Sequence, residues 1–142
     1  RIEPKRYQKN LDELTEMMDL SELLRTPARQ LSLGQRMRCE IAASLLHEPK
    51  VLFLDEPTIG LHPQDVKKLI LIFDHLIQLG ATVIVIEHDL ELITNCDYII
   101  DMGPWGGTEG GRVVVEGAPE AVAACPESIT GRYLKKVLSE DK

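Results

Sequence analysis

The sequence predicts an α/β fold in which a mostly parallel sheet is flanked by helices. Two short apolar runs, residues 51–55 and 82–87, have the length and composition of buried strands. Between them, residues 63–80 repeat apolar side chains every three or four positions, which predicts a helix. A helix that connects two strands is typical of a right-handed crossover between parallel strands. At 142 residues, the chain is one domain or part of one.

The N-terminal third of the chain is predicted to be helical. Residues 5–24 carry an apolar stripe at helical spacing, and Pro27 interrupts the pattern. Ser32 and Gln35 are spaced as a capping box, which predicts that a second helix begins at Ser32. This helix should end before Glu48 and the proline that follows it.

The remaining elements follow the same logic. Pro63 suits the first turn of the crossover helix, and Gly80 suits the position just after its end. Downstream we expect a short helix, a strand, a glycine-rich mobile loop, a returning strand and two helices, at residues 89–95, 98–101, 103–111, 112–117, 119–125 and 128–138. The loop lacks the Gly-Lys-Ser/Thr ending of a phosphate-binding loop, so we interpret it as a connection between strands.

Composition limits the class of protein. A hydrophobic fraction of 44% supports a buried core, and a net charge of −7 disfavours a broad surface for nucleic acid or anionic membrane. Three cysteines without a C-x-x-C motif indicate reduced thiols in a cytosolic protein. No apolar run approaches about 18 residues, so we expect no direct membrane insertion. The chain begins without Met or a signal peptide and is interpreted as part of something longer.

Two adjacent carboxylates, Asp55 and Glu56, end the first predicted strand. The carboxyl edge of a parallel sheet is where α/β folds bind ligands. One interpretation is a Walker B pair, in which Asp55 holds Mg²⁺ and Glu56 handles the attacking water. The alternative is an edge strand that ends in a solvated turn.

Two further segments favour the first interpretation. Ser32 and Gln35 are explained by capping alone, but Gly34 in the first helical turn would let the backbone approach a phosphate. His88 follows the second predicted strand. A lone histidine is more often structural, but this one lies at a strand end in a chain that carries the other two motifs.

In this order, the motifs resemble those of the ATP-binding-cassette (ABC) ATPases. Residues 31–35 resemble the signature motif, with Leu33 where the family usually has Gly, and residues 59–62 occupy the place of the D-loop. Asp55 and Glu56 match the Walker B acid and the catalytic carboxylate, and His88 matches the switch histidine. The resemblance therefore implies ATP and Mg²⁺ as cofactors, Asp55 as metal ligand, and Glu56 and His88 as catalytic residues.

The resemblance also implies a partner and a division of the chain. ABC ATPases form head-to-tail dimers, so Ser32, Gly34 and Gln35 should contact the nucleotide held by a second ABC ATPase module. Residues 1–48 would form a helical signature subdomain, residues 49–126 the C-terminal part of the ATPase core, and residues 127–142 a terminal helix and tail.

No Gly-x-x-x-x-Gly-Lys-Ser/Thr motif occurs in the chain. We therefore expect a partial P-loop NTPase domain whose Walker A half is missing and which is inactive on its own. In the family, the Walker A strand lies between the switch-histidine strand and the strand expected at 98–101. Without it, that strand loses a neighbour, so either the sheet closes across the gap or the fragment is only marginally folded. The cost of unpaired buried backbone groups favours closure or pairing with a partner.

Two branches of the family match different parts of the chain. Residues 1–58 resemble the ATP-binding subunit of an ABC-2-type exporter. Residues 60–138 resemble the C-terminal part of the UvrA family, the damage-sensing ATPases of bacterial nucleotide excision repair, in particular at Ile86 to Leu90 and Asp97 to Pro104. Both branches share the stretch from Leu54 to Thr58, so we hypothesise a recombinant, misassembled or engineered fusion there.

Three functions remain open at this point. The leading one is a fragment of an ABC-type ATPase that couples ATP binding and hydrolysis to DNA damage recognition in nucleotide excision repair, with DNA bound by other regions of the full protein. The second is the ATP-binding subunit of an exporter that works with a membrane permease subunit. The third is a non-catalytic remnant that only binds partners. We expect a cytoplasmic location.

Overall fold

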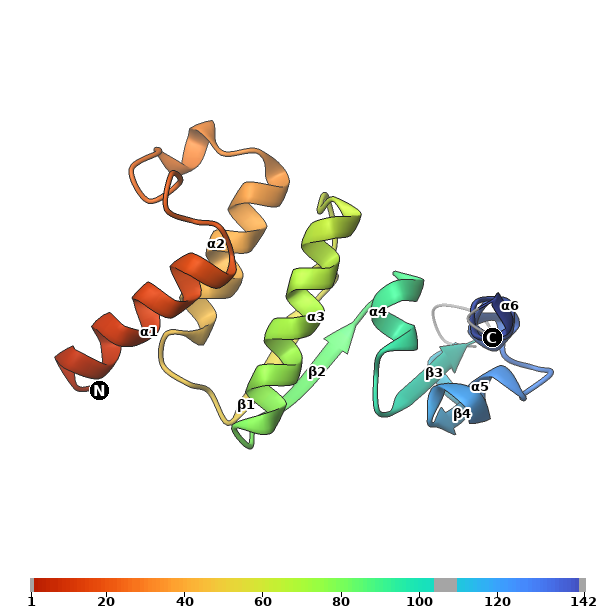
Figure 1. The fold of residues 1–142 in the computed structure, drawn as a ribbon. Helices are drawn as coiled ribbons and strands as arrows, with labels where there is room; N and C mark the ends of the chain where they lie inside the picture. Colours follow the sequence, from red (N-terminus) through yellow and green to blue (C-terminus); the bar gives the residue numbers. More distant parts are fainter. Residues whose placement is uncertain (1, 104–109, 141–142) are drawn as a thin grey trace. The chain divides into compact units, whose positions relative to one another are not determined.

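A computed structural model describes residues 2–103 and 110–140 of the chain (Figure 1). It divides into two compact units, which are residues 1–87 (unit 1) and residues 88–142 (unit 2). The centre of the predicted glycine-rich loop, residues 104–109, lies outside the described residues. The three-segment division expected from the sequence stays a prediction.

Unit 1 opens with two helices, α1 (Pro4–Met17) and α2 (Leu33–Leu45). The first helix was expected to continue to residue 24, but it ends at Met17 because Asp19 adopts a left-handed φ of 51°. Met18 and Leu20 continue the helical periodicity, but they lie in the turn that follows α1 and are buried there. The apolar pattern was therefore correct about the burial of Met18 and Leu20, but no residue within α1 is buried and the helix ends earlier than predicted.

The predicted parallel strands and their crossover helix are confirmed. β1 (Val51–Asp55) pairs with β2 (Thr82–Ile86) in parallel, in a register that runs from Val51 opposite Thr82 to Asp55 opposite Ile86. α3 (Pro63–Gln78) connects them and lies across one face of the pair (Figure 1). Its buried side chains are Val66, Leu69, Ile72, Phe73 and Leu76. Gly80, with φ of 88°, follows the end of the helix as expected.

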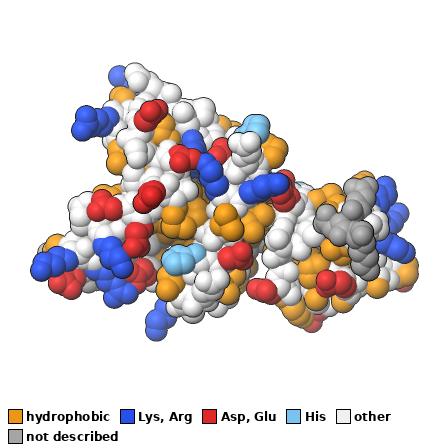
Figure 2. Space-filling view, viewed as in Figure 1, with side chains coloured by type: hydrophobic (Ala, Val, Ile, Leu, Met, Phe, Trp, Pro, Cys, Tyr) orange, Lys and Arg blue, Asp and Glu red, His pale blue; other side chains and the backbone are white. Residues whose placement is uncertain are grey.

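The opposite face of the β1–β2 pair is apolar and exposed. Phe53 and Ile86 are 71% and 60% exposed, and Val51 and Ile84 are also exposed. Parallel strands are normally covered by other elements on both faces. Figure 2 shows that apolar side chains also gather over α3 on the side viewed. The outer side of α3 includes exposed Leu71.

Unit 2 contains α4 (Leu90–Thr94), β3 (Ile99–Gly103), β4 (Arg112–Gly117), α5 (Pro119–Ala123) and α6 (Ile129–Glu140). β3 and β4 form the expected pair of outgoing and returning strands, with antiparallel register. β3 therefore has β4 as its neighbour. The core of this unit is small and is formed by Ile93, Val122 and Leu134.

A polar network fixes the start of α6. The buried Ser128 donates from Oγ to Asp101 Oδ2 at 2.6 Å, and Thr130 Oγ1 donates to Asp101 Oδ1 at 2.8 Å. Ser128 Oγ also accepts from the backbone N–H of Gly131 at 2.7 Å. A Cβ at Gly131 would overlap the carbonyl oxygen of Val122, so the packing of α5 on α6 requires glycine there.

Two expectations about the chain as a whole can be checked within the described residues. Cys39, Cys96 and Cys125 are free thiols, as the sequence indicated. None of the helices in residues 2–103 and 110–140 combines the length and hydrophobicity needed to cross a membrane.

Candidate active site

The acid pair lies where the sequence predicted, at the carboxyl end of β1. Asp55 is the last residue of the strand and is exposed, and Glu56 follows it and is partly buried. The backbone N–H of Glu56 donates to the carbonyl oxygen of Ile86 at 2.9 Å, which extends the pairing one residue beyond β1. The carbonyl oxygen of Glu56 accepts from the N–H of Ile59 at 3.2 Å. The backbone of Glu56 is therefore fixed on both sides.

Glu56 has a left-handed backbone, with φ of 46°. For a residue other than glycine this conformation costs roughly 1–2 kcal/mol. Non-glycine residues in sparsely populated backbone conformations persist where the surroundings determine them, and they cluster at functional sites. No sequence pattern indicated this conformation, because it results from contacts with β2, which lies 30 residues further along the chain.

A second connection between the ends of β1 and β2 was not predicted. The backbone N–H of Thr58 and its hydroxyl both donate to Glu87 Oε1, at 2.8 and 2.5 Å. The two residues follow neighbouring parallel strands, and polar residues in that position are the signal that would have found them. This contact fixes the segment after Glu56 to the residue before His88.

The predicted capping box of α2 is confirmed. Ser32 Oγ accepts from the backbone N–H of Gln35 at 3.2 Å, and Gln35 Oε1 accepts from the backbone N–H of Ser32 at 2.9 Å. In this arrangement the Ser32 hydroxyl hydrogen and the Gln35 side-chain amide can still donate, and both are groups that bind phosphate oxygens. Their contact with a nucleotide stays a prediction.

Gly34 has a packing role that the sequence did not reveal. A Cβ at Gly34 would lie 2.7 Å from the carbonyl oxygen of Gly60, which is too close for any other residue without a shift of the backbone. Gly60 itself has φ of 73°, and a Cβ there would lie 2.7 Å from Leu33 Cδ2. The two glycines thus bring the start of α2 against the segment 59–62. This contact is a reason for glycine at position 34 that is independent of phosphate.

His88 is exposed and is the first residue of unit 2. It comes two residues after Ile86, which lies opposite Asp55 in the parallel register. The strands that lead to the acid pair and to His88 are therefore confirmed as parallel neighbours. The convergence of Asp55, Glu56 and His88 on one triphosphate stays a prediction.

The carboxylates at the end of β1 suit Mg²⁺ only when a bound nucleotide supplies further ligands. Within residues 2–103 and 110–140, no three His, Cys, Asp or Glu side chains gather as a metal site. Mg²⁺, however, is usually held by one or two carboxylates together with water and substrate phosphates, rather than by an all-protein cage. A single exposed carboxylate at the edge of the sheet, such as Asp55, meets that requirement.

The described residues also form a hollow of about 600 Å³ along α6, far in sequence from the acid pair. It is lined by Ile129, Arg132, Tyr133, Lys135, Lys136 and Ser139. None of the predicted site residues is among them, so this hollow is not the predicted nucleotide site.

Comparison with protein families gives one match. The family described as "ABC transporter" matches residues 2–59, a range that contains the signature segment and the acid pair. This range coincides with the part of the chain whose motifs resemble an exporter protein.

Curated relatives and solved structures match more of the chain. It is 45% identical over 119 residues to UvrABC system protein A of Lactiplantibacillus plantarum, and 51% identical over 114 residues to that of Rickettsia typhi. These alignments cover 82% and 78% of this chain but 12% of each relative. The crystal structure of UvrA2 from Deinococcus radiodurans matches with a TM-score of 0.80 and 37% identity, over 89% of this chain and 16% of that one.

The extent of these alignments bears on the proposed fusion. They cover more of the chain than the residues that follow position 59, so they include part of the range that the transporter family matches. One class of relative therefore accounts for sequence on both sides of Leu54 to Thr58. The hypothesis of a fusion at that stretch is not needed to explain the resemblance.

Proposed function

Since this chain belongs to the ABC-type ATPase family, we propose that it supplies the signature, Walker B and switch-histidine part of a UvrA-like ATPase in nucleotide excision repair. The similarity to UvrABC system protein A over about four-fifths of the chain supports this assignment. The observation that supports an active role over a remnant role is the backbone of Glu56, because this carboxylate residue adopts an unfavourable conformation directly after β1.

Each predicted residue has a role in this proposal. Bound ATP with Mg²⁺ would supply the phosphoryl group and the charge that holds it. Asp55 would bind the metal ion, Glu56 would orient the attacking water, and His88 would contact the γ-phosphate. Ser32, Gly34 and Gln35 would offer the N-terminus of α2 to the nucleotide held by a second ABC module.

The proposal requires a Walker A half from another segment, because the chain contains no such motif. The exposed apolar face of the β1–β2 pair supports this requirement. Phe53 and Ile86 together with their neighbours form a surface that parallel strands normally bury. We therefore expect the isolated chain to hydrolyse no ATP.

DNA is a partner of the complete protein rather than of this segment. With 23 acidic against 16 basic residues, the chain lacks the excess of Lys and Arg that phosphate binding needs. Coupling of ATP turnover to damage recognition would thus pass through other regions. A cytoplasmic location is part of the same proposal and rests on the resemblance to repair ATPases.

The match of residues 2–59 to the ABC transporter family favours a second candidate, an ATP-binding subunit that powers export. That candidate requires a membrane permease as partner, whereas the repair candidate requires DNA. Stimulation of ATP turnover by damaged DNA would exclude the transporter function.

A chimeric protein tests the proposal directly. This chain would replace the matching segment of the Lactiplantibacillus plantarum relative, which then provides the rest of the protein. We expect the chimera to hydrolyse ATP and to restore survival after ultraviolet irradiation in bacteria that lack the native protein. Glu56→Gln should lower turnover by about 100-fold or more, since it removes the group that orients water.

Glu120→Gln, at an exposed glutamate in α5, is the matched control and should leave turnover unchanged. A folded chimera that hydrolyses no ATP would contradict the proposal. An active chimera in which Glu56→Gln changes nothing would remove Glu56 from the mechanism and favour the remnant interpretation.

A further inference from the structure

We propose that Thr58 and Glu87 are positioning residues for ATP hydrolysis, because their hydrogen bonds hold Glu56 in its left-handed conformation. The inference rests on the role proposed for Glu56. It adds two residues that lie outside the acid pair, the signature segment and the switch histidine.

The first step is the geometry around Glu56. Its N–H is bound to Ile86 and its carbonyl oxygen accepts from Ile59, so the peptide groups on both sides of its Cα are fixed. Two residues later, Thr58 is bound through two donors to Glu87 Oε1. Thr58 lies between Glu56 and Ile59 in the sequence, so its position limits the path that the chain can take after Glu56.

The second step is the rigidity of the connection. Pro57 separates Glu56 from Thr58, is less than 2% exposed, and has a φ angle locked by its ring. With Pro57 buried and Thr58 anchored, the turn after β1 has little freedom to relax the backbone of Glu56. Without the anchor, the residue can move to a more favourable φ and its carboxylate leaves its place.

The third step is the chemistry of the acceptor. A carboxylate accepts stronger hydrogen bonds than a neutral group, and Glu87 and Thr58 are both only partly exposed, which reduces screening by water. Both donors of Thr58 meet one oxygen, so loss of the carboxylate weakens both hydrogen bonds, whereas loss of the hydroxyl leaves only the one from the backbone N–H. Because Glu87 directly precedes His88, the same contact connects the two segments that carry the proposed catalytic groups.

The test uses steady-state ATP turnover by the chimera described above. Thr58→Val keeps the shape of the side chain and removes the hydroxyl, and it should lower kcat about tenfold or more because catalysis is sensitive to small displacements of a catalytic group. KM should stay within about twofold, because ground-state binding of the nucleotide is unchanged. Thr58→Ser keeps the hydroxyl and should retain near-normal kcat.

Glu87→Gln should likewise lower kcat and leave KM within about twofold. The double variant should be little worse than the worse single variant, because both changes weaken the same contact. Equal losses in Thr58→Val and Thr58→Ser, or an unchanged kcat in Thr58→Val and Glu87→Gln, would overturn the inference. A change in KM alone would also overturn it, since it would indicate a role in binding.

Hydrogen exchange keeps the inference separate from the proposed function. In the same chimera, Thr58→Val and Glu87→Gln should speed amide exchange in the peptide over 56–61 and leave exchange in α2 unchanged. If the unmodified chimera hydrolyses no ATP, the proposed function fails, yet the exchange experiment still tests the contact. Unchanged exchange over 56–61 in both variants would show that the contact does not hold the turn.

Discussion

At the scale of single residues, Glu56 differs from the other non-glycine residues with positive φ in the described chain. Those residues, Asp19 and Glu48, lie in turns just after helices. Left-handed residues are common there because they end the helix. Glu56 instead follows a strand, where no such role exists. Its backbone conformation is therefore explained by the contacts of its peptide groups with Ile86 and Ile59 rather than by the end of a helix.

A pair of substitutions separates the backbone of Glu56 from its side chain. Glu56→Ala and Glu56→Gly both remove the carboxylate, but only glycine adopts positive φ without a steric penalty. We expect the glycine variant to have a free energy of unfolding about 1 kcal/mol higher than the alanine variant. Urea denaturation of the 142-residue chain measures the difference. Equal stabilities would show that the left-handed conformation is not a source of strain.

Sequence reasoning identified the site residues whose signals are local. Ser32 and Gln35 form the capping box that their spacing predicts, and Asp55 ends the strand that precedes it. The contacts that were missed join residues far apart in the chain. Thr58 meets Glu87 across 29 positions, and Gly34 meets Gly60. A sequence pattern does not predict such a contact, because each of the two residues could equally pair with many other residues of the chain.

At the scale of elements, apolar periodicity predicted the crossover helix and both parallel strands almost to the residue. It failed at the end of α1, because Met18 and Leu20 are buried by a turn that keeps the helical spacing of apolar side chains. Buried residues can keep the spacing of a helix beyond the point where the helix itself ends. The end of α1 is therefore determined by the turn at Asp19 and not by the apolar pattern.

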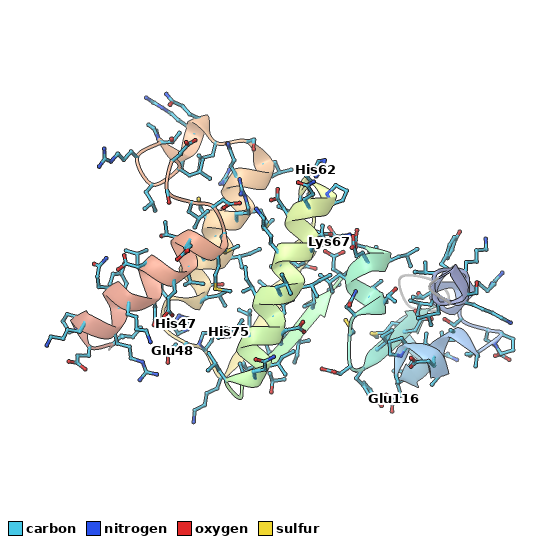
Figure 3. The ribbon with its side chains drawn as sticks, in the orientation of Figure 1. His47, Glu48, His62, Lys67, His75 and Glu116 are labelled. Atoms are coloured by element: carbon cyan, nitrogen blue, oxygen red, sulfur yellow. The ribbon has the colours of Figure 1, made fainter. Side chains whose placement is uncertain are left out.

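A long-range contact between side chains joins α1 to the turn after α2, where Figure 3 labels Glu48. Arg6 and Asn10 donate to the carboxylate of Glu48, and this lowers the pKa of Glu48 below its ordinary value, with the hydrogen bond from Arg6 as the main cause. A lowered pKa in the folded state means that the contact stabilises the fold above the pKa of the unfolded chain, which is about 4.3. This stabilisation is lost as the pH falls through the folded-state pKa.

We therefore expect Glu48→Gln to lower the melting temperature slightly at pH 7, since exposed ion pairs contribute little. The difference from the unmodified chain should shrink as the pH falls below the pKa of the unfolded chain, and it should disappear once the lowered folded-state pKa of Glu48 has been passed. Thermal melts at a series of pH values check this. Glu22→Gln, at another exposed glutamate, serves as the control and should show no such trend. A difference that persists unchanged to low pH would exclude the ionised contact as its cause.

At the scale of the molecule, the described chain consists of two units that each bury their own core. From the sequence we expected closure of the sheet across the gap of the absent Walker A strand, or pairing with a partner, whereas the described residues form two separate two-stranded sheets. The sequence did not predict where the units divide, because the boundary between Glu87 and His88 carries no glycine, proline or change of composition.

The small core of unit 2 makes its stability separable from that of unit 1. Leu134 is fully buried in α6, and Leu134→Ala should cost about 2–5 kcal/mol through the cavity it leaves. We expect amide exchange to speed up in β3 and β4 while α3 keeps its protection. Ile129→Ala, at an exposed position of the same helix, is the control. Equal loss of protection in α3 would show that the two units unfold as one.

The exposed apolar face of the β1–β2 pair has a consequence for how the chain is handled in a cell. Phe53 is mostly exposed to water, and chaperones and proteases of protein quality control recognise exposed apolar surface of this kind. A segment that docks on this side, whether from the same protein or from another, would cover the site at which such factors bind.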